Sequence, residues 1–216
     1  CNKMKREISS QDINSRKDLR SLNFVTIDGS NAKDFDDAVY AEESSDGFLL
    51  YVAIADVSEY VLQDSSLDKE AFSRATSVYF EKKVIPMLPE LISNELCSLR
   101  PKEDKLVLTC EIFLNRKGEI KSFEFFNSVI CSKNRLTYDE VEKFYQKGQA
   151  AFSNEIVSNL RNLKKIHGLR RRIREERKAI DFYLPEYRPV SKDNKIVKFK
   201  SINHLLANEV IEESMI

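Results

Sequence analysis

The sequence predicts an α+β fold in which an antiparallel β-sheet forms the core and helices flank it. Two pairs of β-rich segments support this prediction, because each pair is joined by a short polar turn that is typical of a hairpin. Residues 37–42 and 48–57 flank a Ser-Ser-Asp-Gly turn, and residues 106–114 and 119–132 flank an Asn-Arg-Lys-Gly turn. Helical segments follow the second hairpin, and strands that precede helices in this way are typical of α+β proteins.

The chain begins with a polar segment that leads into a short strand. Residues 1–18 lack periodicity, and we expect them to be a linker or an arm from a preceding domain. Residues 24–27 are β-rich and end at Asp28, after which the Gly-Ser-Asn sequence at 29–31 favours a turn. We expect residues 19–216 to form a single domain.

Helical periodicity and capping signals locate the helices. Residues 67–76 have helical character, whereas the two prolines within residues 84–99 predict an irregular segment with a short helix. Thr137 begins a Thr-Tyr-Asp-Glu sequence, which is the pattern of a capping box at a helix start. A strand is expected at 195–199, and a final helix is expected from about Asn203.

A long amphipathic helix is predicted around residues 152–173, where apolar residues recur at helical spacing. One face of this helix is basic. Such a face is either solvated or contacts phosphates, and Glu175 and Glu176 favour solvation. The basic residues are Arg161, Lys164, Lys165, Arg170, Arg171, Arg172, Arg174 and Arg177.

Composition is that of an ordinary globular protein, with 216 residues, 42% hydrophobic residues, 32% charged residues and zero formal net charge. No apolar run is long enough to span a bilayer, and no signal peptide begins the chain, so we expect a cytoplasmic location and no membrane association.

The four cysteines form no Cys-x-x-Cys pair, which argues against a disulfide framework or a zinc site. The neutral balance counts against a uniformly basic nucleic-acid-binding surface, although charges can be segregated by face.

Four carboxylates fall within ten positions, at Asp28, Asp34, Asp36 and Asp37. Without a cation, carboxylates packed together repel one another and some stay protonated. Carboxylate oxygens suit Mg²⁺, which keeps several waters and completes its coordination shell with substrate phosphate. The segment is therefore a candidate metal site.

Other interpretations of this segment follow from its spacing. A single extended strand would turn Asp37 away from Asp34 and Asp36, so either the backbone bends or the acids serve two ions and a proton-transfer role. A solvated acidic loop is the simplest alternative. An EF-hand calcium loop is excluded, because Lys33 and Val39 stand where that loop needs glycine and glutamate.

The aspartate segment and several further blocks resemble the ribonuclease II/R (RNB) family, closest to its ribonuclease R branch. The resemblance covers residues 18–216 and keeps the order and spacing of the blocks. The matching blocks are Asp18-Leu19-Arg20, Val25–Gly29, Ala32–Ala38, Val52–Ser58, Ile85–Glu90, Leu96–Leu99, Arg135–Tyr138 and Ile211–Ile216.

The resemblance implies a processive, hydrolytic exonuclease that degrades RNA from its 3′ end and releases nucleoside 5′-monophosphates. It also implies one or two Mg²⁺ ions, for which Mn²⁺ is a possible substitute. Asp28 and Asp37 resemble metal ligands, and Asp34 would help to hold a second ion. Asp36 resembles the acid most critical for catalysis, either as a ligand or by orienting the attacking water.

The resemblance further implies residues that contact RNA. Tyr79, Tyr138 and Phe182 resemble aromatic residues that stack on bases, and every base offers a face for such stacking. Ordinary core packing is the alternative for each ring. Glu212 resembles a residue that contacts the nucleotide, and a solvated helix position is its alternative.

The resemblance also implies that the chain is an incomplete catalytic domain. The family has an arginine-rich block later in the domain and flanking cold-shock and S1 modules, and we expect all of these in the parent chain. We expect the fragment alone to be weakly active or inactive, and the full-length form to be monomeric. Two other classes are a catalytically inactive RNA-binding protein on the same scaffold and a structural module that binds a protein partner.

Overall fold

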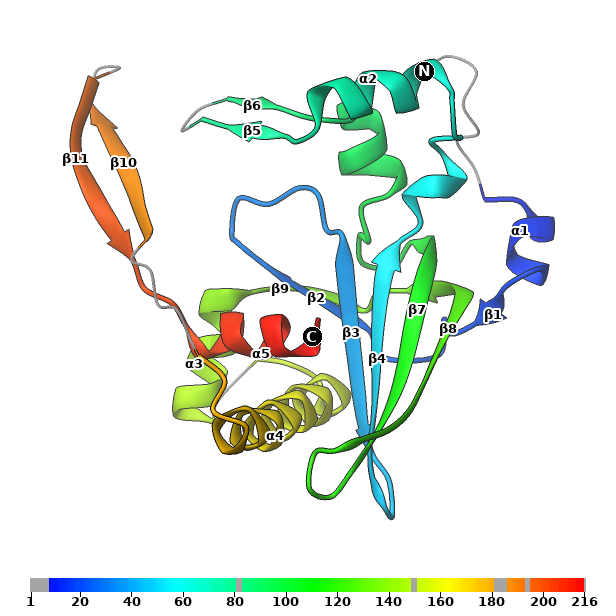
Figure 1. Cartoon of the computed structure of the whole chain (residues 1–216), viewed down its shortest axis with the longest axis vertical. Coiled ribbons are helices and arrows are strands. Elements are labelled where there is room, and N and C mark those ends of the chain that lie inside the picture. Colours follow the sequence, from blue (N-terminus) through cyan, green and yellow to red (C-terminus); the bar gives the residue numbers. More distant parts are fainter. Residues whose placement is uncertain (1–7, 81–82, 149–150, 181–185, 193–194, 216) are drawn as a thin grey trace.

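The computed structural model describes residues 8–80, 83–148, 151–180, 186–192 and 195–215. A seven-stranded sheet forms the centre of the molecule (Figure 1). In their spatial order, its strands are β1 (Lys17–Asp18), β8 (Ile120–Cys131), β7 (Asp104–Asn115), β4 (Gly47–Ala55), β3 (Asp37–Glu43), β2 (Val25–Asp28) and β9 (Asn134–Thr137).

The predicted antiparallel sheet is confirmed in its central part and is mixed at its edges. Both predicted hairpins are present as β3–β4 and β7–β8, and β4 pairs with β7 in antiparallel fashion. The two edge strands, β1 and β9, are short and pair in parallel with β8 and β2. Parallel pairing at the edges arises because each partner is reached by a long crossover rather than by a hairpin turn.

Helices and small hairpins surround this sheet. The helical elements are α1 (Ser10–Asn14), η1 (Val57–Glu59), α2 (Ser66–Arg74), the π-helix η2 (Leu91–Leu96), α3 (Tyr138–Lys147), α4 (Asn154–Glu176) and α5 (Leu206–Ser214). Two separate two-stranded hairpins are β5–β6 (Val78–Tyr79 and Val84–Ile85) and β10–β11 (Glu186–Lys192 and Lys195–Ile202). No helix in the described part combines the length and apolar character needed to cross a membrane.

Local sequence signals explain most of the observed helix boundaries. The predicted capping box is present at α3, where the Thr137 side chain accepts from the Glu140 backbone N–H and Glu140 bonds back to Thr137. The final helix begins at Leu206 rather than near Asn203, because the Asn208 side chain accepts the Leu205 backbone N–H and fixes the start there. The segment 1–18, expected to be an arm, contains α1 and the edge strand β1.

The core lies on both faces of the sheet. Leu50 and Val52 of β4 pack with α3, α4 and α5 on one face, and this helical layer is visible in Figure 1. Tyr51 and Ala53 of the same strand pack on the other face with residues that include Ile92 of η2. Strand β4 is therefore covered on both faces for most of its length.

Helix α4 supplies hydrogen-bond partners for the backbone of β3 where that strand does not pair with β2. The described pairing of β2 with β3 is at Val25 and Val39, so the next polar backbone groups of β3 need other partners. The Ala41 N–H donates to the buried Asn159 Oδ1 at 2.9 Å, and Asn162 Nδ2 donates to the Ala41 carbonyl at 3.2 Å. Two asparagine side chains thus take the place of a neighbouring strand.

Replacing Asn159 should destabilise the protein strongly. Asn159→Ala leaves the buried Ala41 N–H without a partner, which should lower the free energy of unfolding by about 2–3 kcal/mol. Urea denaturation followed by circular dichroism measures this loss. The exposed Asn127→Ala variant in β8 is the control, with an expected change below about 0.5 kcal/mol. Equal losses in the two variants would refute the role given to α4.

Candidate active site

The register of β2 and β3 brings two of the four aspartates to the same end of the sheet. Val25 pairs with Val39 in antiparallel fashion, so Asp28 at the end of β2 lies near Asp37 at the start of β3. The connection between these strands carries Asp34 and has no regular secondary structure over its last residues. The chain turns at Ser30 and Asn31, and residues 32–36 form neither a strand nor a turn.

Backbone contacts hold the connection that carries Asp34 and Asp36. Phe35, which lies between them, is buried in the core, and its N–H donates to Ser98 Oγ at 3.1 Å. The same hydroxyl donates to the Lys33 carbonyl at 2.9 Å, and the Phe35 carbonyl accepts the Leu99 N–H at 2.8 Å. Neither aspartate side chain takes part in these backbone contacts.

The four carboxylates influence one another's protonation. Burial raises the pKa of Asp28 to about 7, and the charge of Asp37 contributes in the same direction. Smaller contributions come from Asp36 and Asp34, whereas the Arg135 guanidinium opposes the shift. Burial also raises the pKa of Asp37 to about 6, with a contribution from Asp36. Burial and the charge of Asp34 raise the pKa of Asp36.

Raised pKa values are the direction expected for carboxylates held close together, although the Asp36 side chain is exposed. Among the residues that the structure describes, however, no three or more carboxylate, thiol or imidazole groups are arranged to hold a metal ion by themselves. The donor set still suits Mg²⁺ in its chemistry, because that ion takes oxygen ligands and completes its shell with waters and phosphate.

Two of the predicted aromatic residues lie beside the aspartates. Tyr79 of β5 is largely exposed, and its hydroxyl donates to Asp34 Oδ2 at a long 3.4 Å. Tyr138 begins α3 directly after β9, whose last residue pairs with Asp28. Burial raises the pKa of Tyr138 to about 12, with contributions from Asp28, Asp37 and Glu212.

The other two residues predicted to contact RNA are Glu212 and Phe182. Glu212 of α5 lies within electrostatic reach of Tyr138, and its exposed carboxylate is 3.3 Å from His204 Nε2. The structure thus brings Glu212 to the same neighbourhood as the aspartates. Phe182 falls outside the described residues.

Arg135 and Ser98 belong to the site but were assigned no role from sequence. Arg135 of β9 donates through Nη2 to the carbonyls of Gly29 and Ser30 at 2.6 and 3.0 Å, and its guanidinium lies over the Phe35 ring. Its Nε is buried without a hydrogen-bond partner. Both residues occur in blocks that carry the family resemblance, but spacing alone gave no indication of which backbone groups they bind.

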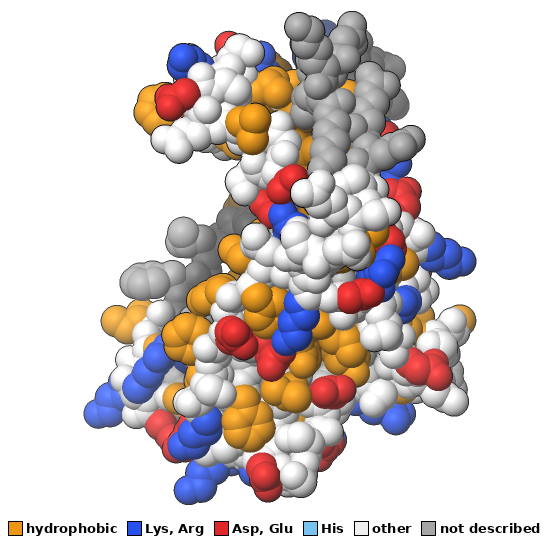
Figure 2. All heavy atoms as spheres, turned by 90° about the vertical axis from the view of Figure 1, so that its right-hand side faces the viewer, with side chains coloured by type: hydrophobic (Ala, Val, Ile, Leu, Met, Phe, Trp, Pro, Cys, Tyr) orange, Lys and Arg blue, Asp and Glu red, His pale blue; other side chains and the backbone are white. Residues whose placement is uncertain are grey.

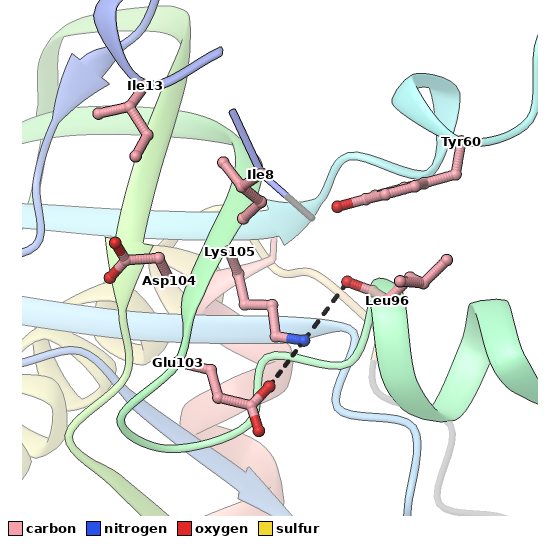
Figure 3. A pocket seen from close by; sticks show the side chains of 7 residues that line it. All are labelled: Ile8, Ile13, Tyr60, Leu96, Glu103, Asp104 and Lys105. Atoms are coloured by element: carbon pink, nitrogen blue, oxygen red, sulfur yellow. Dashed lines mark hydrogen bonds and ion pairs between the residues drawn. The ribbon is translucent and has the colours of Figure 1, made fainter. Parts of the chain in front are cut away.

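The best-formed cavity lies away from the aspartates. It has a volume of about 270 Å³, and Figure 3 shows Tyr60, Leu96 and Lys105 among its lining residues. Lys105 Nζ bonds the Glu95 carbonyl at 2.5 Å and pairs with Glu103 at 3.0 Å. The ammonium group of Lys105 therefore has both a hydrogen-bond partner and an ion-pair partner. We assign the cavity a structural rather than a catalytic role.

Comparisons with known proteins identify the family of this chain. The chain matches the RNB domain family over residues 16–216. It is 42% identical over 205 residues to ribonuclease R of Vibrio parahaemolyticus, an alignment that covers 93% of this chain and 25% of the relative. The chain therefore spans about a quarter of the length of that curated relative.

Solved structures show the same fold. Mycoplasma genitalium RNase R in complex with ribose-methylated single-stranded RNA superposes with a TM-score of 0.93 at 34% identity, covering 97% of this chain and 33% of that one. Yeast Ssd1, described as a pseudonuclease, superposes with a TM-score of 0.73 at 20% identity, covering 96% and 25%, which shows the fold alone. The family match over most of the sequence and the identity to the Vibrio relative together establish that this chain belongs to the RNB family.

Proposed function

We propose that this chain forms part of the catalytic domain of a magnesium-dependent exoribonuclease, with residues 19–216 as the catalytic part. The enzyme would hydrolyse single-stranded RNA processively from its 3′ end and release nucleoside 5′-monophosphates. We expect it to act in the cytoplasm. The observation that carries the proposal is a set of four carboxylates at one end of two adjacent strands, in which burial and neighbouring charges raise the pKa values of Asp28, Asp36 and Asp37. The relatives named ribonuclease R support this assignment.

The family resemblance supplies a proposed role for each aspartate, and the position of each residue is compatible with that role. Asp28 and Asp37 end and begin neighbouring strands, so their backbone is fixed by the sheet, and we assign them as metal ligands. Asp34 and Asp36 belong to the connection between those strands, which Ser98 holds through hydrogen bonds to its backbone. Asp34 would help to hold a second ion. Asp36 would bind that ion or orient the attacking water. Bound Mg²⁺ would stabilise the charge that develops on the attacking and leaving oxygens.

The aromatic residues would position the RNA rather than react with it. Tyr79 projects from a small hairpin next to Asp34, and Tyr138 lies next to Asp28, so the two rings approach the aspartates from different elements. Stacking on such rings is insensitive to base identity, which suits an enzyme that degrades RNA of any sequence. Glu212 would contact the terminal nucleotide, and Phe182 is proposed as a further stacking residue from the family resemblance alone.

Neutralising Asp36 should abolish most hydrolysis. Asp36→Asn keeps the size of the side chain but removes the charge, and we expect the rate of mononucleotide release by the full-length protein to fall roughly 100-fold or more. Release from a labelled single-stranded oligoadenylate in millimolar Mg²⁺ measures this rate, and removal of Mg²⁺ by EDTA should have a comparable effect.

The matched control for this experiment is Asp46→Asn, which removes the same charge from the exposed turn between β3 and β4. Its activity should equal that of the unaltered protein. Undiminished hydrolysis in Asp36→Asn would refute the role of Asp36. If the unaltered protein binds RNA but releases no nucleotide, the catalytically inactive alternative is correct.

Neutralising Asp37 should stabilise the metal-free protein and weaken its response to Mg²⁺. Asp37→Asn removes repulsion from Asp28, so at pH 8 in EDTA the free energy of unfolding should rise by about 1 kcal/mol, or about 3 °C in melting temperature. Added Mg²⁺ should stabilise the unaltered protein more than the variant, because only the former keeps the full ligand set. A variant that is less stable in EDTA, or that responds fully to Mg²⁺, would contradict the assignment.

A further inference from the structure

The hairpin β10–β11 projects from the body of the molecule (Figure 1). Its strands pair in antiparallel fashion from Glu186 and Ile202 toward the tip, with an irregularity after Val190. A two-stranded hairpin that stands apart is marginally stable alone, because neither face is buried. A projecting hairpin of this length therefore raises the question of what it contacts.

One face of the hairpin is aromatic. Tyr187 lies opposite Ser201 and Phe199 lies opposite Pro189, so the two rings are diagonal neighbours on the same face. Both are more than half exposed, at 60% for Tyr187 and 63% for Phe199. Diagonal neighbours across two strands lie about 7–8 Å apart, so two rings at this spacing could each receive one base of an extended strand.

Lysine side chains accompany these rings. Lys195, Lys198 and Lys200 all lie on the face opposite the two rings, because the irregularity after Val190 interrupts the alternation of side chains and Lys195 pairs with Lys192. All three are exposed, and within the described part of the chain none of them forms an ion pair. The hairpin thus combines aromatic rings with cations that have no acidic partner there.

The basic helix α4 differs in this respect. Arg171 pairs with Glu209 at 2.8 Å, Arg170 pairs with Glu213 at 3.4 Å, and Lys165 pairs with Glu43 at 2.7 Å. Much of its charge therefore serves to attach α4 to α5 and β3. The hairpin lysines are the cations on the same element as Tyr187 and Phe199.

The base of the hairpin lies close in sequence to the proposed active site. Strand β11 ends at Ile202, and α5 begins four residues later at Leu206. Helix α5 carries Glu212, whose charge contributes to the raised pKa of Tyr138, as do the charges of Asp28 and Asp37. A strand of RNA held by the hairpin would thus lead toward the catalytic end of the sheet.

We propose that the β10–β11 hairpin is an RNA-binding arm that holds single-stranded RNA upstream of the aspartates. Tyr187 and Phe199 stack on bases, and Lys195, Lys198 and Lys200 contact phosphates. This inference rests on the proposed function for the identity of the ligand. A protein partner would also cover exposed rings, but the adjacent unpaired lysines favour a polyanion.

A second exposed aromatic pair provides a matched control. Phe123 and Phe125 of β8 are 65% and 62% exposed, and their rings lie 5.9 Å apart. Figure 2 shows apolar side chains exposed on the side of the molecule where β8 lies. Glu124 separates the two rings in sequence, and the nearby Lys121 is paired with Glu119 at 2.7 Å. This pair therefore lacks free positive charge.

The first test measures stacking. Fluorescence anisotropy of a labelled oligoadenylate, with EDTA present to prevent hydrolysis, gives the dissociation constant of the full-length protein. The Tyr187→Ala/Phe199→Ala variant should bind roughly 10-fold or more weakly, because each stacked base contributes about 1–3 kcal/mol. Phe123→Ala/Phe125→Ala should bind like the unaltered protein. Phe199→Trp should retain affinity, whereas Phe199→Leu, which keeps an apolar but not an aromatic side chain, should lose it.

The second test measures phosphate contacts. Lys198→Gln/Lys200→Gln should weaken binding and reduce the dependence of log affinity on log salt concentration by about 0.7 for each lost contact. The control Lys117→Gln/Lys121→Gln removes the same charge at the β7–β8 turn and should leave that slope unchanged. Circular dichroism should show an intact fold in all variants, since the altered side chains are exposed.

The outcomes separate this inference from the proposed function. If the hairpin variants bind RNA normally while Asp36→Asn still abolishes hydrolysis, the arm is refuted and the exoribonuclease stands. If the hairpin variants lose affinity while Asp36→Asn remains active, the arm stands and the catalytic assignment fails. Retained affinity in Phe199→Leu would overturn stacking as the mode of binding, and an unaltered protein without RNA affinity would overturn the arm altogether.

Discussion

Repulsion among four carboxylates is the constraint around which the rest of the structure is arranged. Like charges at the ends of β2 and β3 would separate if the connection between those strands could move. The connection is fixed instead by its backbone, through the buried Phe35 ring, the Ser98 hydroxyl and the Asp36 carbonyl, which accepts the Ala55 N–H at 2.9 Å. These contacts hold the connection through its backbone and the Phe35 ring, without using the carboxylates of Asp34 and Asp36.

The contacts between Ser98 and the β2–β3 connection depend in turn on a second set of contacts, which lie farther from the aspartates. Ser98 follows the π-helix η2, whose last carbonyls would lack partners in a buried position. Lys105 reaches these carbonyls, at 2.5 Å from the Glu95 oxygen and 3.4 Å from that of Leu96, beside the cavity of Figure 3. A lysine on β7 thus fixes the end of η2, η2 fixes Ser98, and Ser98 fixes the connection that carries Asp34 and Asp36.

Local patterns predicted the parts of this structure that local physics determines. The hairpins with turns at 44–47 and 115–118, the capping box at Thr137 and the long helix α4 depend on neighbouring residues, and the structure has them all. The parallel edge strands, the asparagine contacts of α4 and the clamp by Ser98 join residues far apart in sequence. Periodicity and spacing describe neighbouring residues only, so they cannot predict such contacts. The family resemblance identified the sequence blocks that contain Ser98 and Arg135, but it did not show which groups these residues contact.

The aspartates could be found from sequence because acid density is local, but their shared electrostatics required the fold. The same fold also occurs in yeast Ssd1, a pseudonuclease, so the scaffold alone does not imply catalysis. This chain has four acids at one end of the sheet, and burial and neighbouring charges raise the pKa values of three of them, Asp28, Asp36 and Asp37. Such an arrangement lowers the stability of the metal-free protein, and replacing any one acid would relieve it. A scaffold that only bound RNA would gain nothing from this arrangement, whereas a site that binds divalent cations requires it.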